Sequence, residues 1–121
     1  MKSGMIQKVK IVGKSWGKEE WFANNEAEDY CGKVLTILKD QSTSMHYHAD
    51  KHETFYVLEG TLQVDWIDTK EGIVNTTIIA SGNAMEMPRN RPHKLIGKGG
   101  NVKLIEASTF HRDEDSFRVY R

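Results

Sequence analysis

Apolar and polar residues alternate with a period of two along most of this chain, and this pattern restricts its fold more than any other feature. Segments 33–38, 61–67 and 102–108 follow it most clearly, and turn-forming pairs such as Glu59-Gly60 separate the alternating segments. Turn signals at intervals of roughly 8–12 residues are typical of an all-β sandwich or barrel. We therefore predict a single antiparallel barrel of roughly six to ten strands, built from two sheets folded together.

The predicted strands are short and cover most of the chain. They lie near residues 6–12, 33–38, 43–48, 54–58, 61–67, 73–79, 84–87, 93–96 and 102–108. Segment 15–26 contains Trp16 and Trp21, and we interpret it as part of an N-terminal arm that packs its aromatic residues on the sheet. The predicted single domain consists of this arm (1–26), a barrel (27–110) and a C-terminal tail (111–121).

The balance of charge and the single cysteine argue against several classes of function. Seventeen Lys and Arg residues balance seventeen Asp and Glu residues, so the chain lacks the basic surface that a nucleic-acid partner requires. No run approaches the ~18 apolar residues of a membrane span, and residues 1–10 do not resemble a signal peptide. Cys31 is the only cysteine, so no internal disulfide can form, and we expect a reducing, cytoplasmic compartment.

Three of the five histidines lie close together in the sequence, and their spacing indicates a metal site. Residues two apart in an extended strand point to the same face, so His46 and His48 project together, whereas His52 is out of phase with Glu53 and should face away. A hairpin after His48 would bring Glu53 back beside the two rings, and His93 opens another apolar segment. Three imidazoles and one carboxylate that converge inside a barrel would bind a divalent transition metal, whose identity (Mn, Zn, Fe, Ni or Co) stays open.

Two stretches around these residues resemble the two motifs of the cupin superfamily. They read His46-x-His48-x4-Glu53-x6-Gly60 and Gly82-x5-Pro88-x4-His93. The resemblance implies a single-domain cupin with the double-stranded β-helix, or jelly-roll barrel, fold and with the three histidines and Glu53 as metal ligands. The chain departs from the family at three turn positions, where Asp40, Asn90 and Gly97 replace the usual residues. Asp and Asn tolerate left-handed backbone nearly as well as glycine does, so these departures do not affect the proposed ligands.

Within the superfamily, the chain most resembles the C-terminal cupin domain of type II mannose-6-phosphate isomerases, which are bifunctional with mannose-1-phosphate guanylyltransferase. The shared features are Trp16-Gly17, Lys33-x-Leu35, Pro88, His93, Leu104-Ile105-Glu106 and Asp113-Glu114-Asp115-x-x-Arg118. The chain has His46 where that family often has Gln, and Thr54-Phe55 where it has a His-Trp pair. The resemblance implies a sugar or a sugar phosphate as the small-molecule partner without fixing which one.

Three further residues become candidate catalytic residues through this resemblance. Lys33 matches a lysine of the isomerases and shares its strand parity with Leu35, so it could point into the barrel as a base or as a hydrogen-bond donor. Arg118 matches the arginine of their tail motif, and its planar guanidinium suits a bidentate grip on a phosphate or on paired hydroxyls. Glu106 matches the glutamate of their late strand and could orient Lys33 or a ligand histidine.

Three functions fit a cupin with this set of ligands, and the sequence leaves all three open. The first is a metal-dependent aldose–ketose isomerase that acts on a sugar or sugar phosphate. The alternatives are a non-catalytic cupin that binds a small molecule and an Fe(II)-dependent dioxygenase. An isomerase should place cations near the metal, whereas an oxygenase should have an apolar pocket. The candidate cations are Lys33, Arg89, Arg91 and Arg118.

The N-terminal segment predicts a homodimer. Residues 2–12 alternate in a way that would let this segment add as a strand to the sheet of a second copy. An all-β chain must cover its edge strands, because unpaired backbone groups there invite further pairing. Many cupins associate in this way, so the resemblance implies the same contact.

Overall fold

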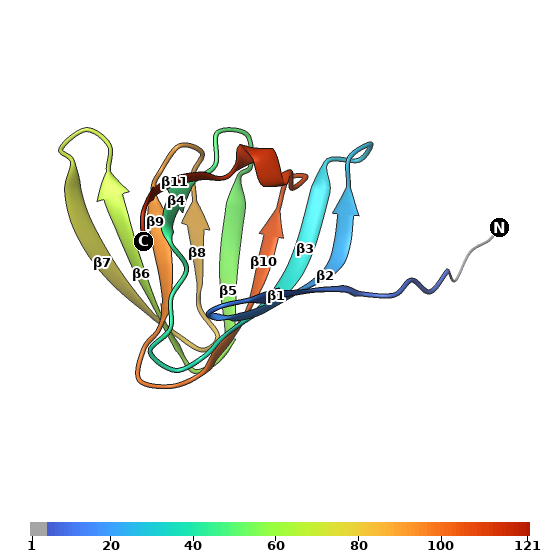
Figure 1. Cartoon of the computed structure of the whole chain (residues 1–121), viewed down its shortest axis with the longest axis horizontal. Helices are drawn as coiled ribbons and strands as arrows, with labels where there is room; N and C mark the ends of the chain where they lie inside the picture. Colours follow the sequence, from blue (N-terminus) through green and yellow to red (C-terminus); the bar gives the residue numbers. More distant parts are fainter. Residues whose placement is uncertain (1–4) are drawn as a thin grey trace.

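The computed structural model describes residues 5–121, which fold into two antiparallel sheets and one short 3-10 helix (Figure 1). The strands are β1 (Lys10–Lys14), β2 (Gly17–Asn25), β3 (Tyr30–Ile37), β4 (Met45–Tyr47), β5 (Glu53–Glu59), β6 (Thr61–Asp68), β7 (Ile73–Ala80), β8 (Ala84–Met87), β9 (His93–Gly97), β10 (Val102–Ser108) and β11 (Phe117–Tyr120), and the helix η1 spans Asp113–Asp115. The predicted all-β fold of two facing sheets is confirmed. No helix in residues 5–121 is long and apolar enough to cross a membrane.

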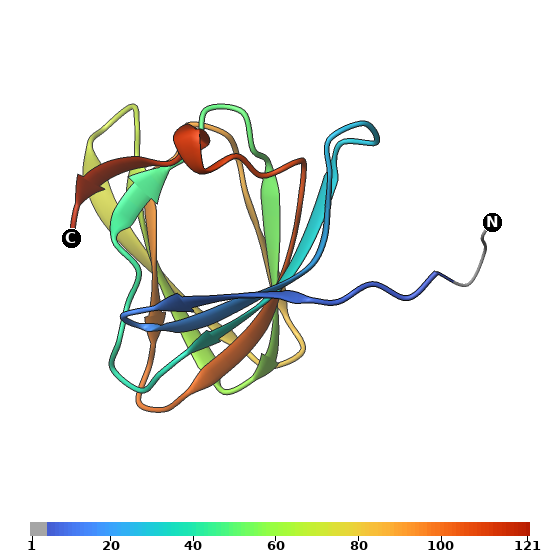
Figure 2. The same cartoon turned by 45° about the vertical axis from the view of Figure 1, so that its right-hand side comes forward.

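The two sheets face each other across the interior (Figure 2). The six-stranded sheet has the order β1-β2-β3-β10-β5-β8, and the five-stranded sheet has the order β11-β4-β9-β6-β7. Strands far apart in the sequence are therefore neighbours, since β3 pairs with β10 and β4 pairs with both β9 and β11. These pairings bring the first sequence motif, on β4 and β5, beside the second motif, on β8 and β9.

The inward-facing side chains of β3, β10 and β5 are apolar toward one end of the interior and charged toward the other. These buried rows read Ile37-Leu35-Lys33, Val102-Leu104-Glu106 and Val57-Phe55-Glu53. The apolar ends pack with Leu62, Val64 and Leu95 of the other sheet in one hydrophobic core. Because alternate residues of a strand share a face, the pattern that forms the core also places three charged side chains in the interior.

Two strands lie outside the predicted set, so the predicted number of strands is too low for the described residues, which form eleven. Segment 15–26, interpreted as an arm, contains β2, which is paired with β3 in the six-stranded sheet. β11 lies in the predicted tail and pairs with β4. Most side chains of β2 are half-buried and all those of β11 are exposed, so neither strand shows a clear alternation. The first strand begins at Lys10 rather than near residue 6.

Three turns in the two motifs use left-handed backbone. Asp40 and Asn90 have φ values of 60° and 67°, which confirms that they occupy turn positions where the family has glycine. Gly60, between β5 and β6, has a φ of 83°, and a Cβ atom there would collide with the backbone carbonyl oxygen of Asn101. Glycine at this position therefore satisfies both the turn and the close approach of a neighbouring segment.

Candidate metal centre

Three histidine rings meet at the charged end of the interior. His46 lies on β4 and His93 on β9, and the two residues are register partners in the five-stranded sheet. His48 follows two residues after His46 and points to the same face, as the period of two predicts. The centroid of the His46 ring lies 4.6 Å from the centroid of the His93 ring and 5.1 Å from that of the His48 ring. One nitrogen from each ring lies within 4.8 Å of the other two, so the three rings could hold one metal ion.

Each of the three rings has its Nδ1 atom bonded to a backbone carbonyl oxygen. The distances are 2.8 Å from His46 to Ser44, 2.9 Å from His48 to Asp115 and 2.9 Å from His93 to Arg91. A carbonyl can only accept, so each ring donates from Nδ1, which leaves Nε2 as the atom that can face a metal ion. Burial lowers the pKa of His46 to about 3, and the nearby His93 adds to this effect. Burial also lowers the pKa of His48, so both rings are neutral, as metal ligands must be.

Glu53, at the start of β5, faces the same rings. Its Oε2 atom lies 3.2 Å from Nε2 of His93 and 3.8 Å from Nε2 of His48, and its Oε1 atom lies 3.1 Å from Nζ of Lys51. Burial alone would raise the pKa of Glu53, but Lys51 and then His93 outweigh burial and hold that pKa well below its usual range. One charged oxygen therefore faces the rings, and Glu53 as the fourth ligand stays a prediction.

Lys51 is buried beside Glu53, and the sequence analysis missed it. Its Nζ atom lies 2.8 Å from Oε2 of Glu106 and 3.0 Å from Nδ1 of His111, in addition to its contact with Glu53. Burial would lower the pKa of Lys51, but the two carboxylates outweigh burial and raise it. Burial raises the pKa of Glu106, and the charge of Glu53 raises it further. Lys51 lies in the connection before β5, where no periodic pattern could reveal its burial.

Lys33 points into the interior from β3, as its strand parity predicts, and its side chain is almost fully buried. Its Nζ atom lies 3.4 Å from Oε1 of Glu19 and 4.1 Å from the centroid of the Trp21 ring. Burial would raise the pKa of Glu19, but the charge of Lys33 outweighs it and lowers that pKa. Glu106 is the register partner of Lys33 on β10, yet its direct ammonium partner is Lys51. The catalytic roles of Lys33 and Glu106 stay predictions.

Arg118 is brought next to the histidines, whereas two other predicted cations are not. It is the register partner of His46 on β11, and both residues line the same cavity. Arg89 instead donates from Nε to the backbone oxygen of Asp50, and Arg91 packs over the Trp66 ring at 4.6 Å. His52 faces away, as predicted, with its Nε2 atom 2.6 Å from Oε2 of Glu86.

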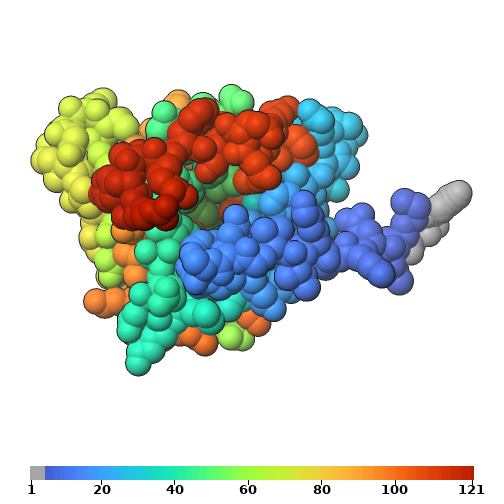
Figure 3. Space-filling view, viewed as in Figure 1, coloured from blue at the N-terminus to red at the C-terminus, as the bar shows by residue number. Residues whose placement is uncertain are grey.

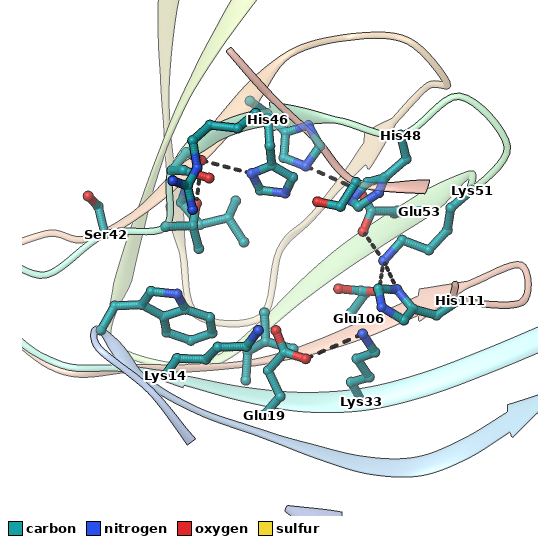
Figure 4. Close-up of a pocket in the computed structure, with 18 of the residues that line it drawn as sticks. Lys14, Glu19, Lys33, Ser42, His46, His48, Lys51, Glu53, Glu106 and His111 are labelled. Carbon is teal, nitrogen blue, oxygen red and sulfur yellow. Dashed lines mark hydrogen bonds and ion pairs between the residues drawn. The ribbon is translucent and has the colours of Figure 1, made fainter. Parts of the chain in front are cut away.

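The cavity in front of these residues has a volume of about 500 Å³. It opens between the C-terminal segment, residues 109–121, and the N-terminal strands β1 and β2 (Figure 3). The histidine wall consists of His46, His48 and His93, and the charged wall consists of Glu19, Lys33, Lys51, Glu53 and Glu106. In Figure 4, His46 and His48 lie on one side of the cavity, and Glu19 and Lys33 lie on the other. Trp16, Leu35, Phe55 and Leu95 form an apolar part of the lining. Polar and charged side chains thus dominate the space next to the histidines.

This arrangement, with the four predicted ligands on or next to β4, β5 and β9, agrees with a comparison against protein families. The sequence profile of the cupin domain matches residues 33–108, more than half of the chain. The chain belongs to the cupin domain family. The matched range contains all four predicted metal ligands of this cupin, and it excludes Arg118 in the C-terminal segment.

Similarity to individual proteins is low in sequence and, for solved structures, high in fold. The chain is 24% identical over 102 residues to the uncharacterized protein YdbB of Bacillus subtilis (strain 168), and the match covers 84% of each protein. The capsular polysaccharide assembling protein CapF of Staphylococcus aureus matches 93% of this chain with a TM-score of 0.81 and 13% identity. Oxalate decarboxylase of Bacillus subtilis, a protein with Mn(II) centres, matches 92% with a TM-score of 0.80 and 13% identity.

The chain spans only about a third of the two larger proteins, 34% of the CapF chain and 30% of the oxalate decarboxylase chain. At these identities the comparison establishes a shared fold and carries no activity across. The finer resemblance to the mannose-6-phosphate isomerase module stays a prediction.

Proposed function

We propose that this cupin is a metal-dependent aldose–ketose isomerase that acts on a sugar or sugar phosphate. The observation that carries the proposal is the alternation of buried carboxylates and ammonium groups in the charged wall, next to the three histidines. A sugar hydroxyl both donates and accepts hydrogen bonds, so a wall with both kinds of group suits a polyhydroxylated ligand. A dioxygenase would favour an apolar pocket, and the polar lining therefore supports the isomerase over that alternative.

The residues present fit a divalent transition metal such as Mn, Zn, Fe, Ni or Co. His46, His48 and His93 would each offer Nε2, because their Nδ1 atoms are bonded to backbone carbonyls, and Glu53 would offer Oε2. When bound, such an ion would polarise the carbonyl oxygen of an open-chain sugar. Lys51 holds Oε1 of Glu53, which leaves the other carboxylate oxygen facing the rings.

Glu106 and Lys33 are the residues that we assign to proton movement. Oε2 of Glu106 accepts from Lys51, whereas its Oε1 forms no hydrogen bond among the described residues. In the aldose-to-ketose direction, Glu106 would take the proton from C2 and deliver it to C1, while a hydroxyl proton moves from O2 to O1. No external oxidant or reductant is needed. Glu19 and the Trp21 ring both stabilise positive charge on Lys33, which supports a role as hydrogen-bond donor to a hydroxyl.

Arg118 would hold the end of the substrate that does not react. Arg118 borders the cavity beside His46, and Lys14 and Arg121 also line it. None of these three side chains forms an ion pair among the described residues. A free guanidinium can bind a phosphate or two adjacent hydroxyls through two parallel hydrogen bonds. Three unpaired cations at the cavity therefore support a sugar phosphate as one class of substrate.

An aldose–ketose screen followed by NMR tests the proposal. We expect mannose 6-phosphate or another aldose to give the matching ketose under argon, with loss of activity after chelation and recovery after addition of a divalent metal. Glu106→Gln should lose turnover, because an amide cannot take the C2 proton. A ligand that binds and is recovered unchanged would instead establish a binding cupin, and consumption of oxygen would establish a dioxygenase.

We also propose that the chain forms a homodimer in the cytoplasm. β1 is an edge strand on which Ile11 is exposed, and the segment before it extends from the body with Ile6 98% exposed (Figure 1). Residues 2–4 of the predicted dimer arm lie outside the described residues. Cys31 is a buried free thiol, which supports a reducing compartment. Light scattering should give a dimer at micromolar concentration and a weaker dimer after deletion of residues 1–12, whereas a wild-type monomer would contradict it.

A further inference from the structure

The C-terminal segment, residues 109–121, reaches the metal centre through one buried acidic side chain, Asp115. This residue ends the helix η1 and is 6% exposed, whereas its neighbours Asp113 and Glu114 are exposed. A buried carboxylate is costly unless it is hydrogen-bonded. Asp115 forms no ion pair with Lys or Arg within the part of the chain that the structure describes, so its hydrogen bonds must come from elsewhere.

The carboxylate of Asp115 accepts hydrogen bonds from three consecutive backbone N–H groups. Oδ1 accepts from Ala49 at 2.8 Å and from Asp50 at 3.0 Å, and Oδ2 accepts from Lys51 at 3.0 Å and from Asp50 at 3.2 Å. The backbone carbonyl of Asp115 accepts from Nδ1 of His48 at 2.9 Å. One residue thus holds four consecutive residues that lie 64 to 67 positions earlier in the chain.

These four residues join two of the proposed metal ligands. The segment begins with His48, whose ring orientation and tautomer depend on the carbonyl of Asp115. It ends with Lys51, two residues before Glu53, and the side chain of Lys51 holds Oε1 of that carboxylate. His46 and His93 differ in this respect, because their Nδ1 atoms bond to carbonyls only two positions away.

We propose that Asp115 is a positioning residue of the metal centre, so that docking of the C-terminal segment and binding of the metal strengthen each other. The inference rests on the metal centre of the proposed function, but it does not depend on which reaction occurs there. Coupling of two binding events is reciprocal. Loss of the Asp115 anchor should therefore weaken metal binding, and metal binding should stabilise the C-terminal segment.

Asp115→Asn tests the first half of this coupling. Both carboxylate oxygens accept from N–H groups, so either orientation of the amide places its NH₂ against a backbone donor. In a titration with Zn²⁺ alone, we expect affinity to fall by about 10–100-fold, the usual effect of losing a partner of a metal ligand. Glu114→Gln removes an exposed charge from the same helical turn and should bind like wild type.

Long-range ¹H–¹⁵N NMR of the metal-free protein distinguishes positioning from general loosening. In Asp115→Asn, His48 should lose its single Nδ1–H tautomer, while His46 and His93 keep theirs. Wild-type Zn²⁺ affinity in Asp115→Asn would overturn the proposal, and so would equal changes at all three histidines.

Hydrogen exchange of the unaltered protein gives a second test that holds even where the variant does not fold. We expect Zn²⁺ to slow amide exchange in peptides that cover residues 109–121. Unchanged exchange in these peptides would overturn the proposal while leaving the metal centre intact. A wild-type protein that binds no Zn²⁺ would overturn the metal centre and, with it, this inference.

Discussion

The two walls of the cavity satisfy their polar side chains in different ways. On the histidine wall, His46 and His93 each donate from Nδ1 to the backbone carbonyl of the residue two positions earlier. Each ring is therefore held by the segment that leads into its own strand. On the charged wall, Lys51 bridges Glu53 and Glu106, so each group depends on the charge of the next. The rings of His46 and His93 are therefore held separately, whereas Lys51, Glu53 and Glu106 behave as one unit within the charged wall. Substitutions on the two walls should differ in kind.

The largest expected effect is a loss of stability when the charged wall is broken. Lys51→Met would leave Glu53 and Glu106 buried without their shared cation. Removal of one partner from a buried ion pair typically costs ~3–5 kcal/mol, because the remaining charge stays desolvated. We expect a loss of this size in the free energy of unfolding, measured with urea.

Two further variants sharpen this prediction. Lys51→Met combined with Glu106→Gln removes one negative charge along with the positive charge and should recover part of the stability. Lys18→Met breaks an exposed pair with Glu20, at 3.6 Å, and should cost less than ~1 kcal/mol. Equal losses for Lys51→Met and Lys18→Met would contradict the view that Lys51, Glu53 and Glu106 form one buried unit.

A smaller effect is expected on turnover when the cations facing the substrate are removed. Arg118→Ala, and Lys33→Met, which keeps the bulk of the buried side chain, should each lower turnover at least tenfold, about 1.4 kcal/mol of barrier. Arg118→Ala should affect phosphorylated substrates most. Arg89→Ala removes a cation that bonds to Asp50 outside the cavity and should leave turnover unchanged. If Arg118→Ala and Arg89→Ala behave alike, the substrate-binding role of Arg118 is wrong.

The smallest expected effect concerns the pH dependence of stability at His111. Burial and the charges of Lys51 and then Lys33 lower the pKa of His111 to about 4, although Asp113 opposes them. The unfolded chain takes up this proton near pH 6.5, and the folded chain resists it until about pH 4. His111 therefore contributes stability that is present above pH 6.5 and is lost as the pH falls toward 4.

His111→Gln isolates this contribution, since glutamine can still accept from Lys51 but does not titrate. Urea unfolding should give similar stability for the variant and wild type at pH 7, and a shallower loss for the variant between pH 6.5 and 4. A steeper loss of stability in the variant would show that the predicted direction of the His111 contribution is wrong.

The sequence predicts the fold well wherever a strand has one buried and one exposed face. β5 and β10 alternate cleanly, and their predicted positions agree closely with the structure. β3 alternates only from Lys33 onward, and its first three residues lie outside the predicted range 33–38. β2 and β11 were missed because the first is half-buried along most of its length and the second is exposed throughout. Their existence depends on pairing with β3 and β4, which is a tertiary property that no local pattern records.

The histidine wall was accessible to sequence reasoning because a strand period and two motifs determine it. His46 and His48 lie two apart, and the pairing of β4 with β9 adds His93. The charged wall was accessible only in part. Strand parity placed Lys33 inside, but Lys51 lies in a connection between strands, and its burial follows only from closure of the C-terminal segment over it. Contacts of this kind arise from chain closure and leave no periodic signal.

The central claim is that the histidine wall binds one divalent metal ion, and elemental analysis of purified protein tests it most directly. Wild-type protein and His52→Ala, whose ring faces away from the cavity, should each carry about one transition metal ion per chain after reconstitution. His46→Ala combined with His48→Ala should carry none, while circular dichroism shows that the strands remain. A double variant that still retains one metal ion per chain would contradict the account.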